Sequence, residues 1–275
     1  MLTYPNIDPL AFSIGPLKVH WYGLMYLFGF IGAWIYGIQR CKRADLDWTR
    51  RQVEDVIFYG ALGVILGGRL GYTLFYGWEG FIADPLSILQ IWKGGMSFHG
   101  GMLGVFLAML IYARRHGKPF FEVTDFIAPW VPIGLGAGRI GNFINGELVG
   151  RVADPDLPWA MVFPFVDQLP RHPSQLYQAL TEGLLFFLIL WWYSSKPRPV
   201  MAVSGVFMMC YGCFRFTTEF FRTPDAHLGF IAFDWMTMGQ LLSIPMIVVG
   251  VVLFHLAMKK KGTRDEGRGT GKSQT

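Results

Sequence analysis

The sequence predicts an all-α membrane protein with about seven transmembrane helices, and three observations support this prediction. Of its 275 residues, 52% are hydrophobic and only 16% are charged, whereas about a quarter of the residues in a soluble globular domain are charged. The apolar residues gather in segments close to the ~20 residues that cross a bilayer as a helix. The basic residues gather in alternate loops between these segments, as they do in polytopic membrane proteins.

The apolar segments and the stretches between them predict the layout of the chain. The predicted spans are residues 20–39, 53–76, 96–112, 122–137, 175–193, 200–216 and 235–258. Residues 151–174 are rich in Pro and Asp and alternate weakly, which predicts short strands in a small aqueous cap at about residues 141–175. The tail, 259–275, is rich in Gly, Lys, Arg and Thr and is expected to be disordered. We therefore expect one membrane domain over residues 1–258, including the cap, followed by a hydrophilic tail.

The distribution of basic residues predicts the orientation. The loops after the first, third and fifth spans, together with the tail, carry sixteen of the 24 Lys and Arg residues, and the loops on the opposite side carry five. Cytoplasmic loops of membrane proteins are enriched in Lys and Arg. The N-terminus is therefore predicted outside and the C-terminus in the cytoplasm.

This topology brings the polar residues of the spans to one depth. Charged and amide side chains in a bilayer are costly unless they are paired, solvated or used. The polar side chains predicted near the outer ends of their spans are Tyr22, Arg69, Tyr72, His99, Arg139, Arg215 and Glu219. The sequence therefore predicts a site at the outer face of the membrane that is open to lipid.

The densest polar stretch has the sequence GRIGNFINGELVG at residues 138–150. It places Arg139, Asn142, Asn145 and Glu147 within nine positions, directly after an apolar run. A guanidinium stays charged when partly dehydrated and forks onto phosphate oxygens. A carboxylate such as Glu147 or Glu219 can pair with such an arginine when no ligand is bound. The predicted ligand therefore carries a phosphate.

Other chemistries have weaker support in the sequence. His99 and His172 are isolated from acidic residues at metal-ligand spacing, so no metal is expected. An intramembrane hydrolase needs a nucleophile, and Ser97 near His99 is the only tempting pair. An anion transporter is expected to distribute polar groups through the membrane depth. A lipid-handling enzyme is therefore favoured over an anion transporter or a phospholipid-binding protein.

Each polar residue also has a structural alternative. Arg69 could bond backbone carbonyls instead of a ligand, and Tyr22 could belong to the interfacial aromatic belt. Arg215, Glu219 and Arg222 lie about one helical turn apart, so they could form ion pairs at a helix end. The residue types leave these alternatives open.

The motif at residues 138–150 resembles, position for position, that of the prolipoprotein diacylglyceryl transferase family. Further segments look like family segments and cover almost the full length of the chain. They are WYGL at 21–24, GGRLGY at 67–72, SFHGG at 97–101, RHPSQLY at 171–177, RFTTEFFR at 215–222 and MGQLLSIP at 238–245.

The resemblance implies a reaction and its partners. The diacylglyceryl group of phosphatidylglycerol is joined through a thioether to the lipobox cysteine that follows the signal peptide of a preprolipoprotein, and glycerol phosphate leaves. The implied partners are phosphatidylglycerol, the preprolipoprotein signal peptide and the bilayer, without a cofactor or a nucleic acid. The implied location is the bacterial inner membrane, with the active site toward the outer leaflet.

The resemblance also implies roles for individual residues. Arg139 would bind the phosphatidylglycerol headgroup, Arg215 would be essential beside it, and His99 is the candidate base for the thiol. The other implied lipid-binding residues are Asn142, Asn145, Glu147, Tyr22 and Arg69. The implied supporting residues are Gly150, Glu219, Arg222 and His172.

Overall fold

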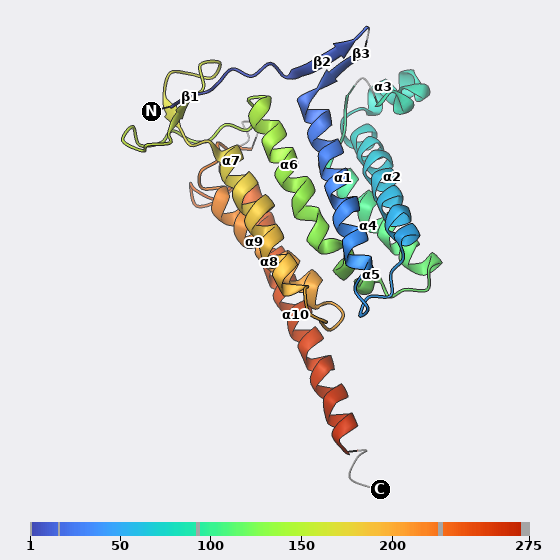
Figure 1. The fold of residues 1–275 in the computed structure, drawn as a ribbon. Coiled ribbons are helices and arrows are strands. Elements are labelled where there is room, and N and C mark those ends of the chain that lie inside the picture. Colours follow the sequence, from blue (N-terminus) through green and yellow to red (C-terminus); the bar gives the residue numbers. More distant parts are fainter. Residues whose placement is uncertain (1, 16, 92–93, 225–227, 271–275) are drawn as a thin grey trace. The chain divides into compact units, whose positions relative to one another are not determined.

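The structure is a computed structural model that describes residues 2–15, 17–91, 94–224 and 228–270. It is mostly helical (Figure 1), which confirms the all-α prediction. The helices are α1 (Trp21–Cys41), α2 (Arg50–Phe75), α3 (Trp78–Ala83), η1 (Pro85–Leu89), α4 (Phe98–Arg115), α5 (Phe120–Ile127), η3 (Ala128–Trp130), α6 (Val131–Ile144), α7 (Ser174–Gln178), η4 (Ala179–Leu185), α8 (Phe186–Tyr193), α9 (Ala202–Thr218) and α10 (Met238–Thr270).

Every predicted apolar segment contains a helix. Within the described residues, 4 helical segments are long and apolar enough to cross a membrane: Trp21–Cys41, Arg50–Phe75, Ser174–Tyr193 and Met238–Lys260. The chain is therefore a multi-pass membrane protein. The fourth predicted span is not one regular helix but the series α5, η3 and α6, in which Pro129 and Pro132 interrupt the backbone hydrogen bonding.

The prediction of disorder after Met258 is wrong for the described part of the tail. The helix α10 continues without a break to Thr270. Lys and Arg are good helix formers, and extending an existing helix avoids the unfavourable nucleation step. Composition alone therefore misplaced the end of the helix.

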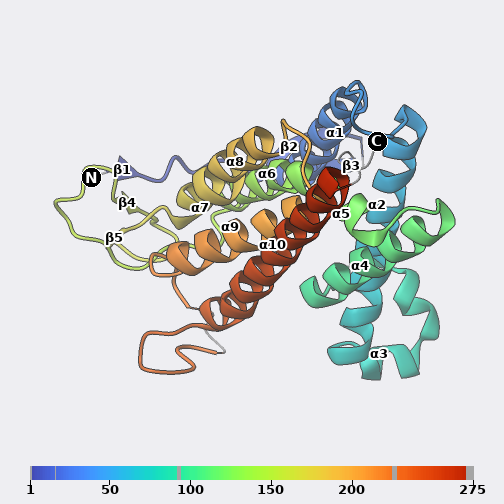
Figure 2. The same ribbon diagram turned by 90° about the horizontal axis from the view of Figure 1, so that it is seen from below.

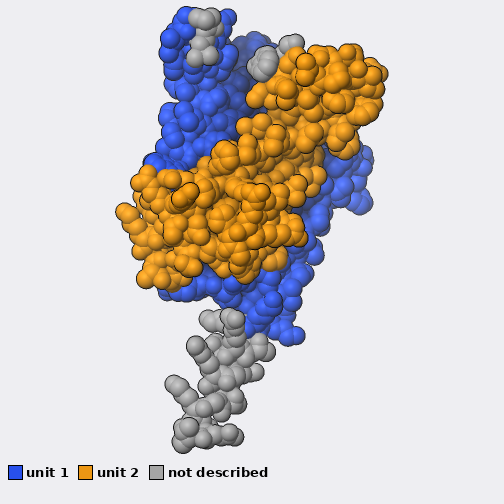
Figure 3. Space-filling view, turned by 90° about the vertical axis from the view of Figure 1, so that its right-hand side faces the viewer, with its two compact units in different colours: residues 1–35, 125–275 blue, residues 36–124 orange. Residues whose placement is uncertain are grey.

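The chain folds into two compact units, shown in different colours in Figure 3. The second unit is Tyr36–Thr124, in which α2 packs against α4. This packing is close because glycines face each other: a Cβ on Gly63 would lie 2.6 Å from the Gly104 carbonyl oxygen. The connection between α2 and α4 contains η1, which begins after Asp84 as the sequence suggests, because the Leu86 N–H donates to the Asp84 carboxylate at 3.1 Å.

The first unit comprises Met1–Ile35 and Asp125–Thr275. Its apolar core is formed by buried side chains of η3, α8 and α9, namely Ala128, Phe186, Leu190, Val203 and Val206. The helix α10 lies along α9, as Figure 2 shows from below. The helices α7, η4 and α8 follow one another as a single helical rod beside α6.

Short strands lie at one end of the helices of this unit. β1 (Leu2–Thr3) pairs in parallel with β4 (Met161–Val162), which pairs antiparallel with β5 (Pro170–Arg171). A separate hairpin joins β2 (Leu10–Ile14) to β3 (Leu17–His20) directly before α1. The Tyr4 hydroxyl donates to the carbonyls of Phe143 and Ile144 at 2.9 and 2.8 Å. The small sheet is thus joined to the C-terminal end of α6, where the polar motif lies.

A glycine pair sets the distance between α6 and the π-helix η4. A Cβ on Gly183 would lie 2.7 Å from the Gly136 Cα, so neither position has room for a side chain. The two backbones can approach this closely because glycine has no Cβ. Arg139 follows Gly136 by one turn and Glu182 directly precedes Gly183, so the glycine contact brings these two charged residues together.

Candidate active site

The polar motif forms the C-terminal end of α6. Gly146 has a positive φ of 69°, which costs glycine little. Its N–H donates to the Phe143 carbonyl, and the Glu147 N–H donates to the Asn142 carbonyl at 2.9 Å. These two bonds are the Schellman motif that ends many helices. The turn explains why the motif contains Gly146 and why Glu147 folds back toward α6.

The Glu147 carboxylate binds the two asparagines of the motif. Asn142 Nδ2 donates to Glu147 Oε2 at 3.1 Å, and Asn145 Nδ2 donates to Glu147 Oε1 at 3.2 Å. The Gln175 amide donates to the Glu147 backbone carbonyl at 2.6 Å. Glu147 therefore orients amide groups, and among the described residues its carboxylate pairs with no arginine.

Arg139 is bound by Glu182, which lies in the middle of the π-helix η4. Arg139 Nε and Nη2 both donate to Glu182 Oε2, at 3.1 and 3.0 Å. The other oxygen, Oε1, accepts a bond from Thr218 Oγ1 at 3.3 Å and lies 3.9 Å from Arg215 Nη1. The Glu182 side chain is fully buried. One carboxylate therefore lies between the two arginines that the sequence places at the centre of the site.

Glu219 completes this arrangement on α9. Its Oε2 lies 2.8 Å from Arg215 Nη2, and its Oε1 accepts from Arg222 Nη1 at 3.1 Å. We refer to Arg139, Glu182, Arg215, Glu219 and Arg222 as the arginine–glutamate cluster. The ion pairing that sequence analysis offered as an alternative for the α9 residues is thus present, and it is continuous with the contacts of Arg139.

Gly239, the second residue of α10, leaves room for the cluster because it has no side chain. A Cβ on Gly239 would lie 3.0 Å from the Glu219 carboxyl carbon and 3.1 Å from Arg215 Nη2. Arg215 Nη1 is buried and, among the described residues, makes no hydrogen bond. A buried N–H without a partner is uncommon in a native protein. This donor is therefore available to an anion that enters the cluster.

Gly150 lies where three chain segments meet. A Cβ at this position would lie 2.1 Å from the His172 carbonyl oxygen and 2.7 Å from that of Phe221. Gly150 also forms an isolated antiparallel bridge with Arg222. Gly150 is thus required for close packing beside the cluster, and its supporting role in catalysis stays a prediction.

His172 belongs to an aromatic group next to this junction. Its Nδ1 lies 3.1 Å from the Tyr177 hydroxyl, and its ring packs edge-on against Phe221 with a centroid distance of 5.1 Å. Burial lowers the pKa of His172 below its ordinary value of 6.5. A neutral His172 is therefore suited to packing and hydrogen bonding, and its supporting role in the site stays a prediction.

Tyr22 contacts the motif from α1. Its ring lies against Gly141, where a Cβ would be 2.8 Å from Tyr22 Cδ2. Its hydroxyl lies 3.3 Å from that of Tyr26. Tyr22 thus packs beside the motif, and its contact with lipid stays a prediction.

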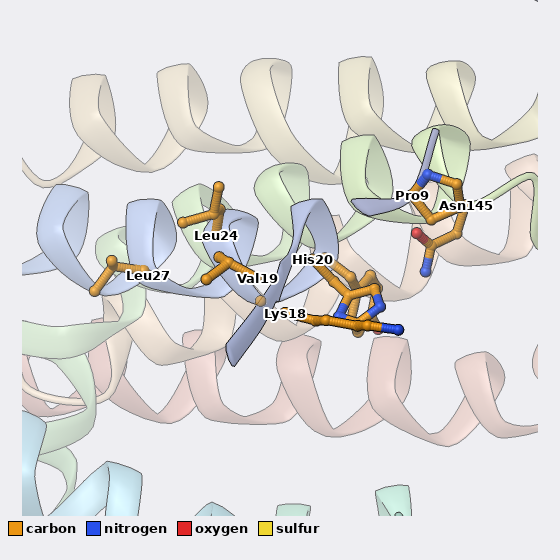
Figure 4. A pocket seen from close by; sticks show the side chains of 9 residues that line it. Pro9, Lys18, Val19, His20, Leu24, Leu27 and Asn145 are labelled. Atoms are coloured by element: carbon orange, nitrogen blue, oxygen red, sulfur yellow. The ribbon is translucent and has the colours of Figure 1, made fainter. Parts of the chain in front are cut away.

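An open pocket of about 680 Å³ lies beside Tyr22. Figure 4 shows Lys18, His20 and Asn145 at one end of it, and Leu24 and Leu27 farther along α1. The pocket is therefore polar near the motif and apolar along the helix.

Two predicted site residues, Arg69 and His99, lie in the second unit. The Arg69 guanidinium donates to the carbonyls of Ser87, Ile88, Gly94 and Gly95, the last three at 2.9, 2.6 and 3.0 Å. This geometry matches the structural alternative, in which Arg69 stabilises the loop between α2 and α4. Its contact with lipid stays a prediction.

His99 lies in the first turn of α4. Ser97 is the N-cap of this helix and accepts a bond from the Gly100 N–H at 3.2 Å. The His99 side chain is exposed. The N-cap thus places an accessible imidazole at the start of the helix, and its catalytic role stays a prediction.

Glu182 is not among the site residues predicted from the sequence. It is the only charged residue within the fifth predicted span, 175–193, and this isolation was the available signal. Gln175, Gln178 and Glu182 lie along one side of the helical rod and are fully buried. Within this buried polar stripe, Glu182 binds Arg139 and lies near Arg215, and the apolar composition of the segment concealed this feature.

The described residues therefore define a multi-pass membrane protein with a partly buried cluster of guanidinium groups suited to an anion. The family model for prolipoprotein diacylglyceryl transferase matches residues 9–256. The chain is 60% identical over 260 residues to the phosphatidylglycerol–prolipoprotein diacylglyceryl transferase of Pseudomonas paraeruginosa, covering 94% of this chain and 97% of that protein. It is 61% identical over 261 residues to the protein of the same name from Coxiella burnetii, covering 95% and 99% of the two chains. The chain belongs to the prolipoprotein diacylglyceryl transferase family and is a transferase.

Proposed function

We propose that this chain transfers the diacylglyceryl group of phosphatidylglycerol to the lipobox cysteine of a preprolipoprotein. The new bond is a thioether between the cysteine sulfur and the glycerol carbon that carried the phosphate. The carbon–oxygen bond to that phosphate breaks, and glycerol phosphate leaves with the bonding electrons. The names of the related transferases support the two substrates, and the arginine–glutamate cluster supports the phosphate chemistry.

Arg139 and Arg215 stabilise the leaving group. The phosphodiester of phosphatidylglycerol carries one negative charge, and the leaving phosphate gains another as the carbon–oxygen bond breaks. Arginine N–H groups aimed at this phosphate stabilise the transition state more than the ground state, with an effect of a few kcal/mol per well-placed donor. The single observation that carries this role is the convergence of both guanidinium groups on Glu182.

His99 accepts the proton of the substrate thiol. A thiolate is the reactive form of cysteine, and histidine is the side chain that most often serves as a general base. The exposed position of His99 at the start of α4 is compatible with this role. No cofactor and no nucleophile of the enzyme itself are needed, because the peptide supplies the sulfur.

The motif orients the lipid. Asn142, Asn145 and Glu147 form the hydrogen-bonded end of α6, and they would bind the headgroup together with Tyr22. The pocket beside them supports lateral entry of a lipid, with an acyl chain along Leu24 and Leu27. Arg69 would contribute indirectly, by stabilising its loop.

The proposal includes a position in the membrane. Seven spans, with the N-terminus outside and the C-terminus in the cytoplasm, would place the motif, the small sheet and His99 toward the outer leaflet of the bacterial inner membrane. The sheet would then be part of an aqueous cap at about residues 141–175. Residues 1–258 would form the catalytic domain, and 259–275 would be a cytoplasmic extension. The charged groups of the arginine–glutamate cluster gather in the C-terminal halves of α6 and α9 and beside them, which counts against a transport path through the membrane.

The test is transfer by the purified protein. The enzyme in detergent is given phosphatidylglycerol labelled in its headgroup glycerol and a lipobox peptide, and both labelled glycerol phosphate and peptide mass are measured. Release that requires the peptide cysteine, with a diacylglyceryl gain in peptide mass, is expected. A peptide with serine in place of cysteine is the control. Release without peptide would indicate a lipid hydrolase, and binding without release would indicate a phospholipid-binding or transport protein.

A further inference from the structure

The position of Glu182 has a consequence for how phosphate enters and leaves the cluster. Its two carboxylate oxygens bind groups from two different helices: Oε2 accepts from Arg139 on α6, and Oε1 accepts from Thr218 and faces Arg215 on α9. A phosphodiester also has two non-bridging oxygens that can bridge a pair of guanidinium groups. Glu182 thus occupies the place between the arginines that a bridging phosphate would take.

We propose that Glu182 is a resident anion that phosphate displaces from Arg139 and Arg215 during each catalytic cycle. This inference rests on the proposed function, and it makes Glu182 a positioning residue that acts through the two arginines. When no phosphate is bound, its charge separates two partly buried cations that would otherwise repel each other. After the reaction it returns to them and drives the glycerol phosphate out.

The hydrogen bonding of the arginines favours exchange over a fixed structural ion pair. Arg139 uses one edge of its guanidinium on a single oxygen of Glu182, and its side chain is 18% exposed. Arg215 Nη1 is buried, lies 3.9 Å from Glu182 Oε1 and makes no hydrogen bond within the described chain. A phosphate oxygen at normal hydrogen-bond distance would satisfy this donor, which Glu182 does not. The cluster is therefore completed by an incoming anion.

The backbone around Glu182 restricts where the carboxylate can go. Glu182 lies at the centre of η4, a π-helix from Ala179 to Leu185, and π-helical turns occur frequently at functional sites. The next residue, Gly183, is in close contact with Gly136 of α6, so the main chain at Glu182 is fixed against that helix. Exchange then requires movement of side chains only.

One buried side chain lies close enough along the same helix to take part. Gln178 precedes Glu182 by one turn, is fully buried, and neither its Nε2 nor its Oε1 has a hydrogen-bond partner among the described residues. Its amide N–H₂ is a donor that a displaced Glu182 carboxylate can use, because residues four apart lie on the same face of a helical turn. Gln178 therefore provides a second position for Glu182 when phosphate binds.

The inference predicts opposite effects on affinity and turnover. In Glu182→Gln the amide oxygen still accepts from Arg139, but the negative charge that competes with phosphate is gone. Glycerol phosphate should bind roughly tenfold or more tightly, since a charge-assisted interaction between buried groups is lost only from the empty enzyme. Turnover should fall because product release slows, while KM for phosphatidylglycerol falls as well. A merely structural role would lower the Tm and would not tighten product binding.

The experiment measures binding of glycerol phosphate to the full-length protein in detergent by calorimetry, without lipid or peptide, together with the Tm. Glu122→Gln is the matched control, because Glu122 also pairs with a cation, Lys118, at 2.8 Å but lies in the second unit. Its affinity should equal that of the unsubstituted protein. Unchanged or weaker binding by a folded Glu182→Gln would overturn the proposal, as would the failure of the unsubstituted protein to bind glycerol phosphate at all.

A second variant applies if Glu182→Gln does not fold. Thr218→Val removes the 3.3 Å hydrogen bond to Glu182 Oε1 and leaves the charge in place. It should tighten glycerol phosphate binding in the same direction by a smaller factor, and unchanged or weaker binding would contradict displacement. Transfer by the unsubstituted enzyme tests the proposed function separately, so a transferase with unaltered product affinity in both variants would refute only this inference.

Discussion

Replacement of Arg215 by lysine keeps the positive charge at this position but removes the planar set of guanidinium donors. The guanidinium places Nη2 2.8 Å from Glu219 Oε2 and Nη1 3.9 Å from Glu182 Oε1. A lysine ammonium is a single point donor and cannot face both carboxylates and a phosphate at once. Arg215→Lys should therefore retain the pair with Glu219 and lose the donor assigned to the leaving phosphate. One charge-assisted hydrogen bond contributes ~1.5–3 kcal/mol, which corresponds to a roughly 10- to 150-fold loss of kcat/KM.

The assay is the initial rate of glycerol phosphate release with a saturating lipobox peptide, at several phosphatidylglycerol concentrations. The control is Arg43→Lys, because Arg43 also forks onto a carboxylate, with Nε and Nη2 at 3.0 and 2.7 Å from Asp45, but lies in the second unit. This control should keep its activity. Full activity of Arg215→Lys would refute the argument and leave Arg215 with an ion-pairing role satisfied by any cation.

Three further predictions follow from the site and one from the C-terminal helix. Arg139→Ala should abolish transfer while the protein still inserts into membranes; near-normal turnover in the same assay would remove the central role of the motif. Gly150→Ala, whose Cβ would lie 2.1 Å from the His172 oxygen, should reduce stability by about 1–3 kcal/mol, seen as a lower Tm; Gly80→Ala, with nothing within 4 Å, should not. Burial lowers the pKa of His172 from 6.5, so the unfolded chain binds a proton at this residue more readily than the folded chain does. The free energy of unfolding that the neutral ring contributes is therefore fully present above about pH 6.5. It is lost as the pH falls from there through the lowered pKa of the folded state. The Tm of His172→Gln should thus decline less between roughly pH 7 and pH 5, and an equal decline would contradict a neutral His172 ring in the folded protein. Deletion of residues 259–275 should leave transfer largely intact, and a folded but inactive truncation would show that the end of α10 contributes to catalysis.

Hydrophobic segments and turn residues predicted most of the helical architecture. Five of the seven apolar runs place helices within about three residues of their observed ends, whereas α6 and α10 continue farther. Backbone hydrogen bonds must be satisfied inside a bilayer, which favours helices in such runs. The polar character of the end of α6 was also predictable, because Asn145, Gly146 and Glu147 follow an apolar run that cannot continue as an apolar span. The turn that these residues form was not predicted. The extension of α10 beyond Met258 was not predictable, because composition alone does not distinguish a helix from a disordered tail.

The charge pairing within the site was less accessible from sequence. Arg139, Arg215 and Glu219 were identified by their position at one end of the spans, but the choice of carboxylate depends on which helices are neighbours. Glu182 was hidden in an apolar segment, and only the Gly136–Gly183 contact places it beside Arg139. Arg69 is the opposite case. An arginine within a predicted span suggested a ligand-binding residue, but its N–H groups donate to backbone carbonyls.

The fate of the oxygen that bridges the diacylglyceryl carbon and phosphorus tests the central claim most directly. Phosphatidylglycerol carrying a heavy isotope of oxygen at this position is incubated with the enzyme and a lipobox peptide, and both products are analysed by mass spectrometry. If the thiolate attacks carbon while Arg139 and Arg215 stabilise the departing phosphate, all of the heavy oxygen will be in glycerol phosphate and the lipidated peptide will have none. Heavy oxygen retained with the diacylglyceryl group would mean that the phosphorus–oxygen bond breaks instead, and it would contradict the account.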